Sequence, residues 1–122
     1  MSIELQNVNF TYPGTDVGVT GIDLTVADGE LLAVIGASGS GKTTLLKLIA
    51  GFETTNAGHI LLNGEDVSRL PVRDRQLGVV FQSYALFPHM TAWQNVAYPL
   101  KIRRTAPAER HRLAVEALAR VG

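Results

Sequence analysis

The sequence predicts an α/β fold in which a covered sheet is joined to a helix by a glycine-rich loop. Residues 31–35 are wholly apolar, residues 36–41 are rich in glycine and serine, and residues 44–50 have a helical pattern. A second wholly apolar run covers residues 77–81. Because such runs are typical of parallel strands covered by helices on both faces, both are expected to form buried strands.

An antiparallel β region is expected before the loop. Residues 3–12 place apolar side chains at alternate positions, but the phase changes between Leu5 and Val8, which indicates a bulge or a bend. Residues 13–16 have turn chemistry, and residues 20–26 alternate again as a half-buried strand. Two neighbouring strands joined by a turn are therefore predicted.

The loop should lead into a helix that ends at Gly51, a favourable C-cap residue. Residues 54–58 form a predicted loop. Residues 60–62 are then expected to form a strand that ends in a tight turn at Asn63-Gly64.

Two more helices are predicted near the C-terminal end of the sequence. Thr91 and Gln94 fit a capping box, so a helix should begin there and run to about Tyr98, with Pro99 disrupting it. The last helix should begin near Pro107 and end at Gly122. Its apolar face is expected to contain Leu113, Ala117, Leu118 and Val121.

Composition is that of a soluble globular protein or part of one. Of 122 residues, 46% are hydrophobic and 18% are charged, and there is no cysteine, which excludes disulfides and thiolate chemistry. No apolar stretch approaches the roughly 20 residues of a membrane span, and no leader opens the chain, so a cytoplasmic location is expected.

Residues 1–66 carry a net charge of −6 and residues 67–122 carry +6. The basic residues lack interleaved aromatics and are interpreted as a solvated helical surface, so no nucleic acid is expected as a partner.

Residues 36–44 satisfy the phosphate-binding (Walker A) pattern Gly-x-x-x-x-Gly-Lys-Ser/Thr. Glycines allow main-chain N–H groups to turn inward, and the following helix adds unpaired donors and its dipole. Lys42 can place a positive charge on the β and γ phosphates, and Thr43 can offer a hydroxyl to Mg²⁺. A turn that merely reverses the chain is the alternative, but the flanking strand and helix favour nucleotide binding. The predicted ligands are Gly36, Ala37, Ser38, Gly39, Ser40, Gly41, Lys42, Thr43 and Thr44.

Three further motifs occur in a fixed order around the loop. They are Phe-Thr-Tyr-Pro-Gly at 10–14, Asn-Gly-Glu-Asp at 63–66 and Gly-Val-Val-Phe-Gln-Ser-Tyr-Ala-Leu-Phe-Pro-His-Met-Thr at 78–91. Together they strongly resemble the ATP-binding subunits of ABC transporters, especially importers of polyamines, ferric iron, sugars, sulfate or phosphonates. The resemblance implies an ABC-type nucleotide-binding domain of the P-loop NTPase fold, with an antiparallel β region and the start of a helical subdomain.

The resemblance also implies roles for residues outside the loop. Tyr12 would stack on adenine, although an ordinary edge-strand tyrosine is the alternative. Gln82 would be the Q-loop glutamine, whose amide oxygen reaches Mg²⁺ or the attacking water; otherwise it merely ends a strand. Residues 83–88 would face the membrane partner, and internal packing of the cluster 84–87 remains an equal alternative.

Several parts of the family pattern are not found in residues 1–122. These are the Leu-Ser-Gly-Gly-Gln signature, the apolar Walker B strand ending in Asp-Glu, and the switch histidine. His59, His89 and His111 lack the required strand-end context, so none is assigned to catalysis. The sequence is therefore interpreted as the N-terminal portion of the domain, with Lys42 and Gln82 as its catalytic residues but no hydrolytic carboxylate. The strands predicted at residues 31–35 and 77–81 are therefore expected to have edges without a neighbouring strand.

The resemblance implies ATP and Mg²⁺ as cofactors, with Thr43 and Gln82 near the metal ion. It implies transmembrane permease subunits and a second ATP-binding subunit as partners, a solute-binding protein as an indirect partner, and a peripheral location on the cytoplasmic face of the inner membrane. The alternatives are a truncated nucleotide-binding or docking module without turnover, a non-transport ABC-type ATPase, and a small kinase or GTPase. The GTPase alternative lacks its Asn-Lys-x-Asp motif.

Overall fold

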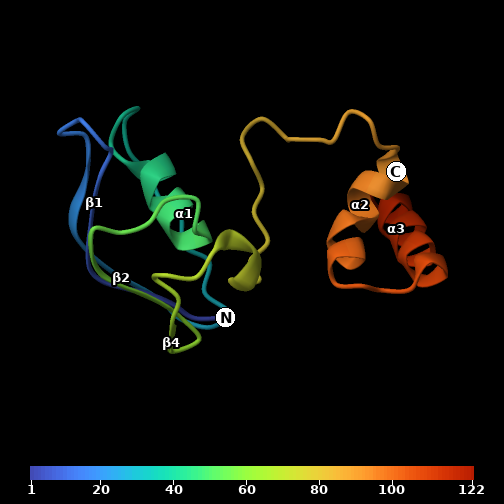
Figure 1. Ribbon diagram of the computed structural model, residues 1–122, viewed down its shortest axis with the longest axis horizontal. Coiled ribbons are helices and arrows are strands. Elements are labelled where there is room, and N and C mark those ends of the chain that lie inside the picture. The colour runs from blue at the N-terminus through green and yellow to red at the C-terminus, as the bar shows by residue number, and fades with distance from the viewer. The chain divides into compact units, whose positions relative to one another are not determined.

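The computed structural model describes residues 1–122, which form two compact units, Met1–Val79 and Val80–Gly122 (Figure 1). The first unit contains a sheet, helix α1 (Lys42–Ala50) and a short 3₁₀ turn, η1 (Val72–Asp74). The second unit contains helices α2 (Ala92–Ile102) and α3 (Pro107–Val121). No helix in the structure is both long enough and apolar enough to cross a membrane.

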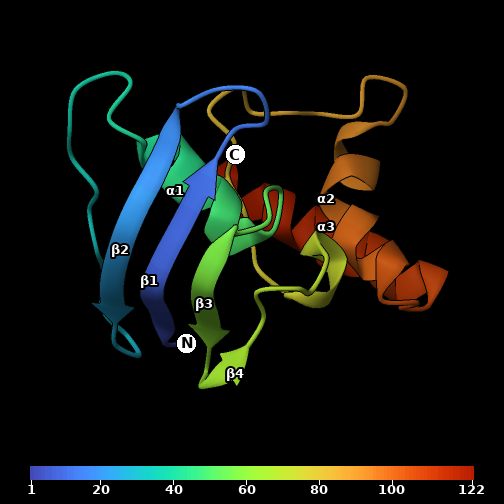
Figure 2. The ribbon, with the colours of Figure 1, turned by 60° about the vertical axis from the view of Figure 1, so that its left-hand side comes forward.

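The sheet of the first unit is antiparallel throughout, with strand order β2-β1-β3-β4 (Figure 2). Its strands are β1 (Ile3–Thr11), β2 (Gly18–Val26), β3 (Ala57–Leu62) and β4 (Glu65–Asp66). This arrangement confirms the predicted antiparallel β region. The turn between β3 and β4 also lies where it was predicted, with positive φ angles of 52° at Asn63 and 78° at Gly64.

Strand β1 contains the predicted irregularity. Its pairing with β2 shifts register between Leu5 and Val8, and Asn7 between them has a φ of +47°. In a regular strand, residues three apart point to opposite faces of the sheet. The bulge instead lets both Leu5 and Val8 become buried, at 2% and 0% exposure.

Helix α1 lies against one face of the sheet and completes the core of the first unit (Figure 2). Leu48 on this helix is fully buried. Gly51 ends the helix as predicted, with a φ of +94° and its N–H bonded to the Lys47 carbonyl. The buried core residues are Leu5, Val8, Phe10, Leu48, Ile60, Leu62 and Val67.

A polar cluster joins β3 to the segment after β4. The Asp66 carboxylate accepts hydrogen bonds from the Ser68 hydroxyl at 2.6 Å and the Ser68 N–H at 2.9 Å, and it lies 2.8 Å from His59 Nδ1. The Ser68 bonds chiefly, with His59, lower the pKa of Asp66 to about 2. The carboxylate is therefore ionised at neutral pH, and His59 belongs to this hairpin rather than to the phosphate loop.

Two predicted strands are absent from the structure. Residues 31–35 and 77–81 pair with no strand, and Leu31, Ile35 and Val80 are 96%, 92% and 89% exposed. A strand needs a neighbour for its hydrogen bonds, and none of the four strands present pairs with either run. The prediction of buried strands at these positions was therefore wrong for this structure.

In the second unit, α2 begins at the predicted capping box. The Thr91 hydroxyl accepts from Gln94 N, and the Gln94 amide oxygen accepts from Thr91 N at 2.8 Å. The predicted end at Tyr98 is wrong, because the helix continues through Pro99 to Ile102. Proline inside a helix removes the bond of its own N–H and crowds the carbonyl four residues earlier, but neither effect ends α2 here.

Helix α3 packs against α2, and the Trp93 and His111 rings meet edge to face with centroids 4.8 Å apart. It begins at Pro107 and ends at Val121, with Gly122 as its C-cap, as predicted. Its inner face is nearly the predicted one: Ala114 is buried and Leu113, Ala117 and Leu118 are half-buried, whereas Val121 is 85% exposed.

Candidate functional site

The glycine-rich loop leads directly into α1 and leaves the helix N-terminus open. Residues 36–40 are exposed, and Gly41 is the N-cap with a φ of +95°. No side chain caps the helix, and the Leu45 N–H donates to the Gly41 carbonyl at 2.9 Å. The amides of residues 42–44 precede that first helical bond and are available to an anion, where the helix dipole favours negative charge.

Lys42 folds over the same loop. Its Nζ donates to the carbonyl oxygens of Gly36 and Ala37, both at 2.6 Å, and to the Ser40 hydroxyl at 3.2 Å. No carboxylate neutralises the ammonium group in this arrangement. The loop therefore presents a positive charge beside the open amides of α1, a combination that suits a phosphate chain.

Two glycines of the loop lie close to neighbouring side chains. A Cβ at Gly36 would lie 2.7 Å from Ser40 Oγ, and one at Gly41 would lie 2.7 Å from Val19 Cγ1. Gly41 also has a backbone conformation that side chains disfavour. Glycine is therefore favoured at Gly41 by its conformation, whereas the Ser40 side chain beside Gly36 could move aside.

Tyr12 lies beside this helix N-terminus. Its hydroxyl is 3.0 Å from the Thr44 hydroxyl, and its ring meets the edge of Phe10 at 4.9 Å with an interplanar angle of 80°. Tyr12 follows the end of β1, whereas Thr44 is in the first turn of α1. The fold thus brings together two predicted site residues from distant parts of the sequence, and adenine stacking by Tyr12 stays a prediction.

Gln82 belongs to the second unit, whereas Lys42 belongs to the first. It is exposed within a turn in which Tyr84 N donates to the Phe81 carbonyl at 3.1 Å. The joint action of Gln82 with Lys42 and Thr43 stays a prediction.

The donors present fit ATP with Mg²⁺. No group of three or more His, Cys, Asp or Glu side chains is placed to hold a metal ion, whereas the Thr43 residue is exposed at the loop. Mg²⁺ accepts few protein ligands and retains phosphate oxygens and water. The role of Thr43 as a ligand of Mg²⁺ stays a prediction.

Arg75 is a structural residue that sequence reasoning missed. It is only 5% exposed, and Nη1 donates to the carbonyl oxygens of Leu48 at 2.7 Å and Ile49 at 2.9 Å. Further bonds from Nε and Nη2 reach Leu70 and Ser68. Burial lowers the pKa of Arg75. The residue caps the C-terminal end of the helix that carries Lys42, so its interpretation as a solvated surface arginine was wrong.

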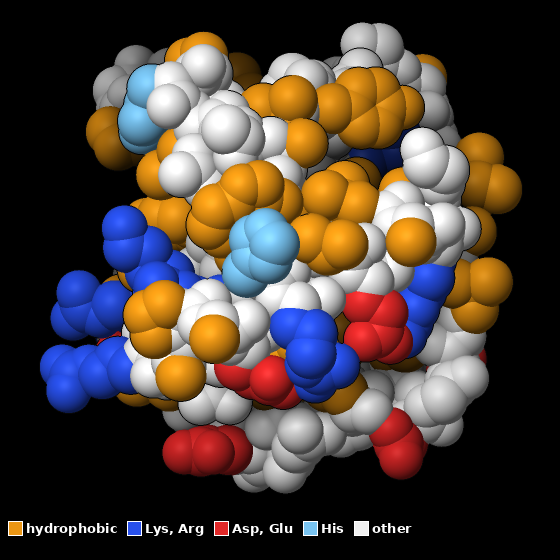
Figure 3. Space-filling model, turned by 90° about the vertical axis from the view of Figure 1, so that its right-hand side faces the viewer, with side chains coloured by type: hydrophobic (Ala, Val, Ile, Leu, Met, Phe, Trp, Pro, Cys, Tyr) orange, Lys and Arg blue, Asp and Glu red, His pale blue; other side chains and the backbone are white.

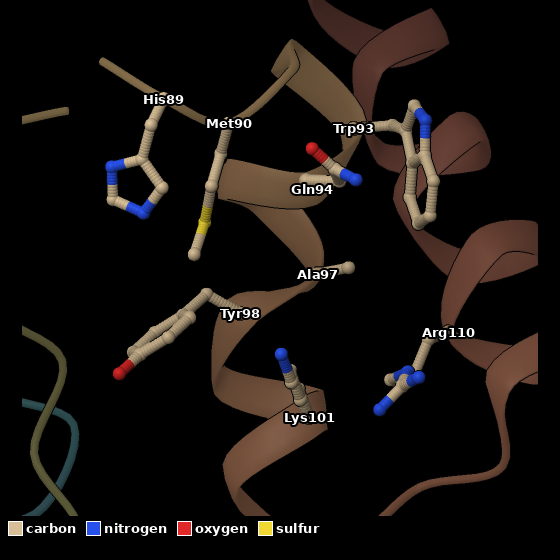
Figure 4. Close-up of a pocket in the computed structure, with 8 residues that line it drawn as sticks. All are labelled: His89, Met90, Trp93, Gln94, Ala97, Tyr98, Lys101 and Arg110. Carbon is tan, nitrogen blue, oxygen red and sulfur yellow. The ribbon is translucent and has the colours of Figure 1, made fainter. Parts of the chain in front are cut away.

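The second unit has its own hollow, of about 280 Å³, between α2, α3 and the segment before them (Figure 4). Hydrophobic side chains gather beside Lys and Arg on the face that carries these helices (Figure 3). The lining residues are His89, Met90, Trp93, Gln94, Ala97, Tyr98, Lys101 and Arg110. Lys101 and Arg110 make this hollow partly basic, and it contains no residue of the phosphate loop.

The apolar cluster 84–87 was expected either to face a membrane partner or to pack internally. Its residues do both. Tyr84 is 80% exposed and Leu86 is 74% exposed, as a docking surface requires. Phe87 instead packs on Tyr98 with ring centroids 4.6 Å apart, and its N–H donates to Asn95 Oδ1 at 2.8 Å.

The loop, its lysine and the open helix N-terminus define a P-loop nucleotide-binding protein. The ABC transporter family model matches residues 19–122, and the chain belongs to the ABC transporter family. This membership rules out the small-kinase and GTPase alternatives.

Curated relatives are import ATP-binding proteins. The spermidine/putrescine import ATP-binding protein of Photobacterium profundum is 44% identical over 116 residues, which cover 95% of this chain and 31% of the relative. The sulfate/thiosulfate import ATP-binding protein of Methylococcus capsulatus is 50% identical over 103 residues, which cover 84% of this chain and 29% of the relative. The chain therefore spans about a third of the length of these relatives.

Solved structures confirm the fold as part of an ABC-type cassette. A dimeric ATP-binding cassette in a post-hydrolysis state, bound to ADP and Pi, matches with a TM-score of 0.85 at 29% identity. A dimeric bacterial ABC transporter cassette matches with a TM-score of 0.83 at 28% identity. Each match covers 96% of this chain and 56% of the other chain.

Proposed function

We propose that residues 36–44 bind Mg-ATP and that, in the complete domain, ATP hydrolysis energises solute import. The observation that carries the proposal is the Lys42 ammonium group held over the loop beside the uncapped N-terminus of α1. The names of the relatives favour an importer over a non-transport ABC-type ATPase.

Each site residue has a role in this proposal. Main-chain amides of the loop and Lys42 bind the β and γ phosphates, and the Thr43 hydroxyl is a ligand of Mg²⁺. Tyr12 stacks on adenine. Gln82 supplies its amide oxygen to Mg²⁺ or to the attacking water. No carboxylate lies among the loop residues to act as a general base.

Without such a base, the 122-residue chain should bind Mg-ATP but release no phosphate beyond the rate of a blank. A continuous phosphate-release assay on purified protein, with Lys42→Ala as the comparison, measures this. Sustained release by the wild-type chain that disappears in Lys42→Ala would contradict the binding-only behaviour of residues 1–122. The same result would support turnover by this segment alone.

We also propose that the complete protein docks on transmembrane permease subunits, pairs with a second ATP-binding subunit and lies peripherally on the cytoplasmic face of the inner membrane. A solute-binding protein would act only through the permease. Tyr84 and Leu86 support docking, because both are exposed and hydrophobic. The dimeric cassettes among the structural matches support pairing.

In the complete protein, Leu86→Glu should abolish co-purification with the permease subunits, because it places a charge in a hydrophobic contact. Val17→Glu is a matched control, since Val17 is also strongly exposed but lies in the turn between β1 and β2, outside the cluster. Equal co-purification of both variants and the wild type would refute the docking role of Leu86.

A further inference from the structure

We infer that Tyr12 has a second task at the proposed nucleotide site: its hydroxyl orients the Thr44 hydroxyl toward the phosphate chain. This inference rests on the proposed function. It makes Tyr12 a positioning residue for phosphate as well as a platform for the base, and it follows from one contact across 32 positions of sequence.

The geometry holds both hydroxyls in place. Tyr12 Oη and Thr44 Oγ1 are 3.0 Å apart in a partly buried setting. Thr44 is 8% exposed, so little water competes for its hydroxyl. The edge contact with Phe10 restrains the Tyr12 ring. Either hydroxyl can donate in this pair, so its direction depends on what else the two groups contact.

When phosphate is present, the number of protons on the two hydroxyls decides which one donates to the other. Each hydroxyl has a single proton to donate, and phosphate oxygens at neutral pH act as acceptors. If Tyr12 donates to Thr44, the Thr44 proton is free to donate to a phosphate oxygen. If Thr44 donates to Tyr12, that proton is used and phosphate meets only lone pairs. Phosphate therefore selects the order tyrosine to threonine to phosphate, in which each bond polarises the next.

Two ligands distinguish an effect on phosphate binding from an effect on adenine binding. Titrations of Mg-tripolyphosphate, which has no base, and of Mg-ATP are compared for the wild type, Tyr12→Phe, Thr44→Val and the double variant. Tyr12→Phe keeps the ring but removes the donor. Each single variant should weaken tripolyphosphate binding about threefold, as expected for one hydrogen bond. The double variant should be no weaker than Thr44→Val, because both changes remove the same chain of bonds.

Thr25→Val is the control for removing a threonine hydroxyl, because Thr25 is exposed on β2 away from the loop. Thermal unfolding of every variant shows whether a loss of affinity follows a loss of structure. Wild-type affinity of Tyr12→Phe for tripolyphosphate, or losses that multiply in the double variant, would overturn the inference and leave the proposed function intact. Failure of the wild type to bind Mg-ATP would overturn both.

Discussion

Replacement of Lys42 by alanine should weaken Mg-ATP binding by about ten- to a hundredfold. The expected loss corresponds to a hydrogen bond made by a charged group, which typically contributes about 1.5–3 kcal/mol. In the structure, Nζ donates to the carbonyl oxygens of Gly36 and Ala37 and to the Ser40 hydroxyl, so it lies at the loop and a phosphate oxygen replaces one of these three acceptors on binding. Titration with a fluorescent ATP analogue measures the change.

Lys47→Ala is the matched control for Lys42→Ala. Both lysines belong to α1, but Lys42 begins the helix beside the loop, whereas Lys47 is in its last turn. Its replacement changes the net charge equally and should leave the affinity nearly unchanged. Equal affinities of the wild type and Lys42→Ala would refute the phosphate role of Lys42.

Replacement of Arg75 by methionine should lower the free energy of unfolding of the first unit by about 2–4 kcal/mol, because several buried carbonyl oxygens lose their donor. Methionine retains much of the apolar stem, so the change tests the hydrogen bonds more than the packing. Arg73→Met should change the stability by less than about 0.5 kcal/mol, since the Arg73 side chain is 81% exposed.

The measurement for Arg75 must report on the first unit. Trp93, the only tryptophan, lies in the second unit, so its emission is unsuitable. Amide hydrogen exchange of α1 residues reports the local opening energy directly. Unchanged exchange in Arg75→Met would mean that the four bonds of this guanidinium contribute no net stability.

Local signals explain which elements were predicted correctly. The change of phase between Leu5 and Val8, the turn at Asn63-Gly64 and the capping box at Thr91 each depend on residues close together in sequence, and all three appear in the structure. The runs 31–35 and 77–81 have the composition of buried strands, but composition does not supply the neighbouring strand that pairing requires.

The phosphate loop could be identified from sequence because its chemistry lies in nine consecutive residues. The Tyr12–Thr44 contact could not be predicted, because it depends on how the end of β1 meets the start of α1. Arg75 was missed for a related reason. Nothing near it in sequence indicates that its guanidinium reaches the last turn of a helix more than 25 residues earlier.

Calorimetric titration of the wild-type chain with Mg-ATP tests the central claim most directly. If main-chain amides at the start of α1 and Lys42 bind the phosphates, the titration should give a saturable heat that fits one site. Lys42→Ala should reduce this heat, and excess Mg-ADP should compete with Mg-ATP for the site. The absence of any saturable heat with folded protein, or a heat unchanged in Lys42→Ala, would contradict the account.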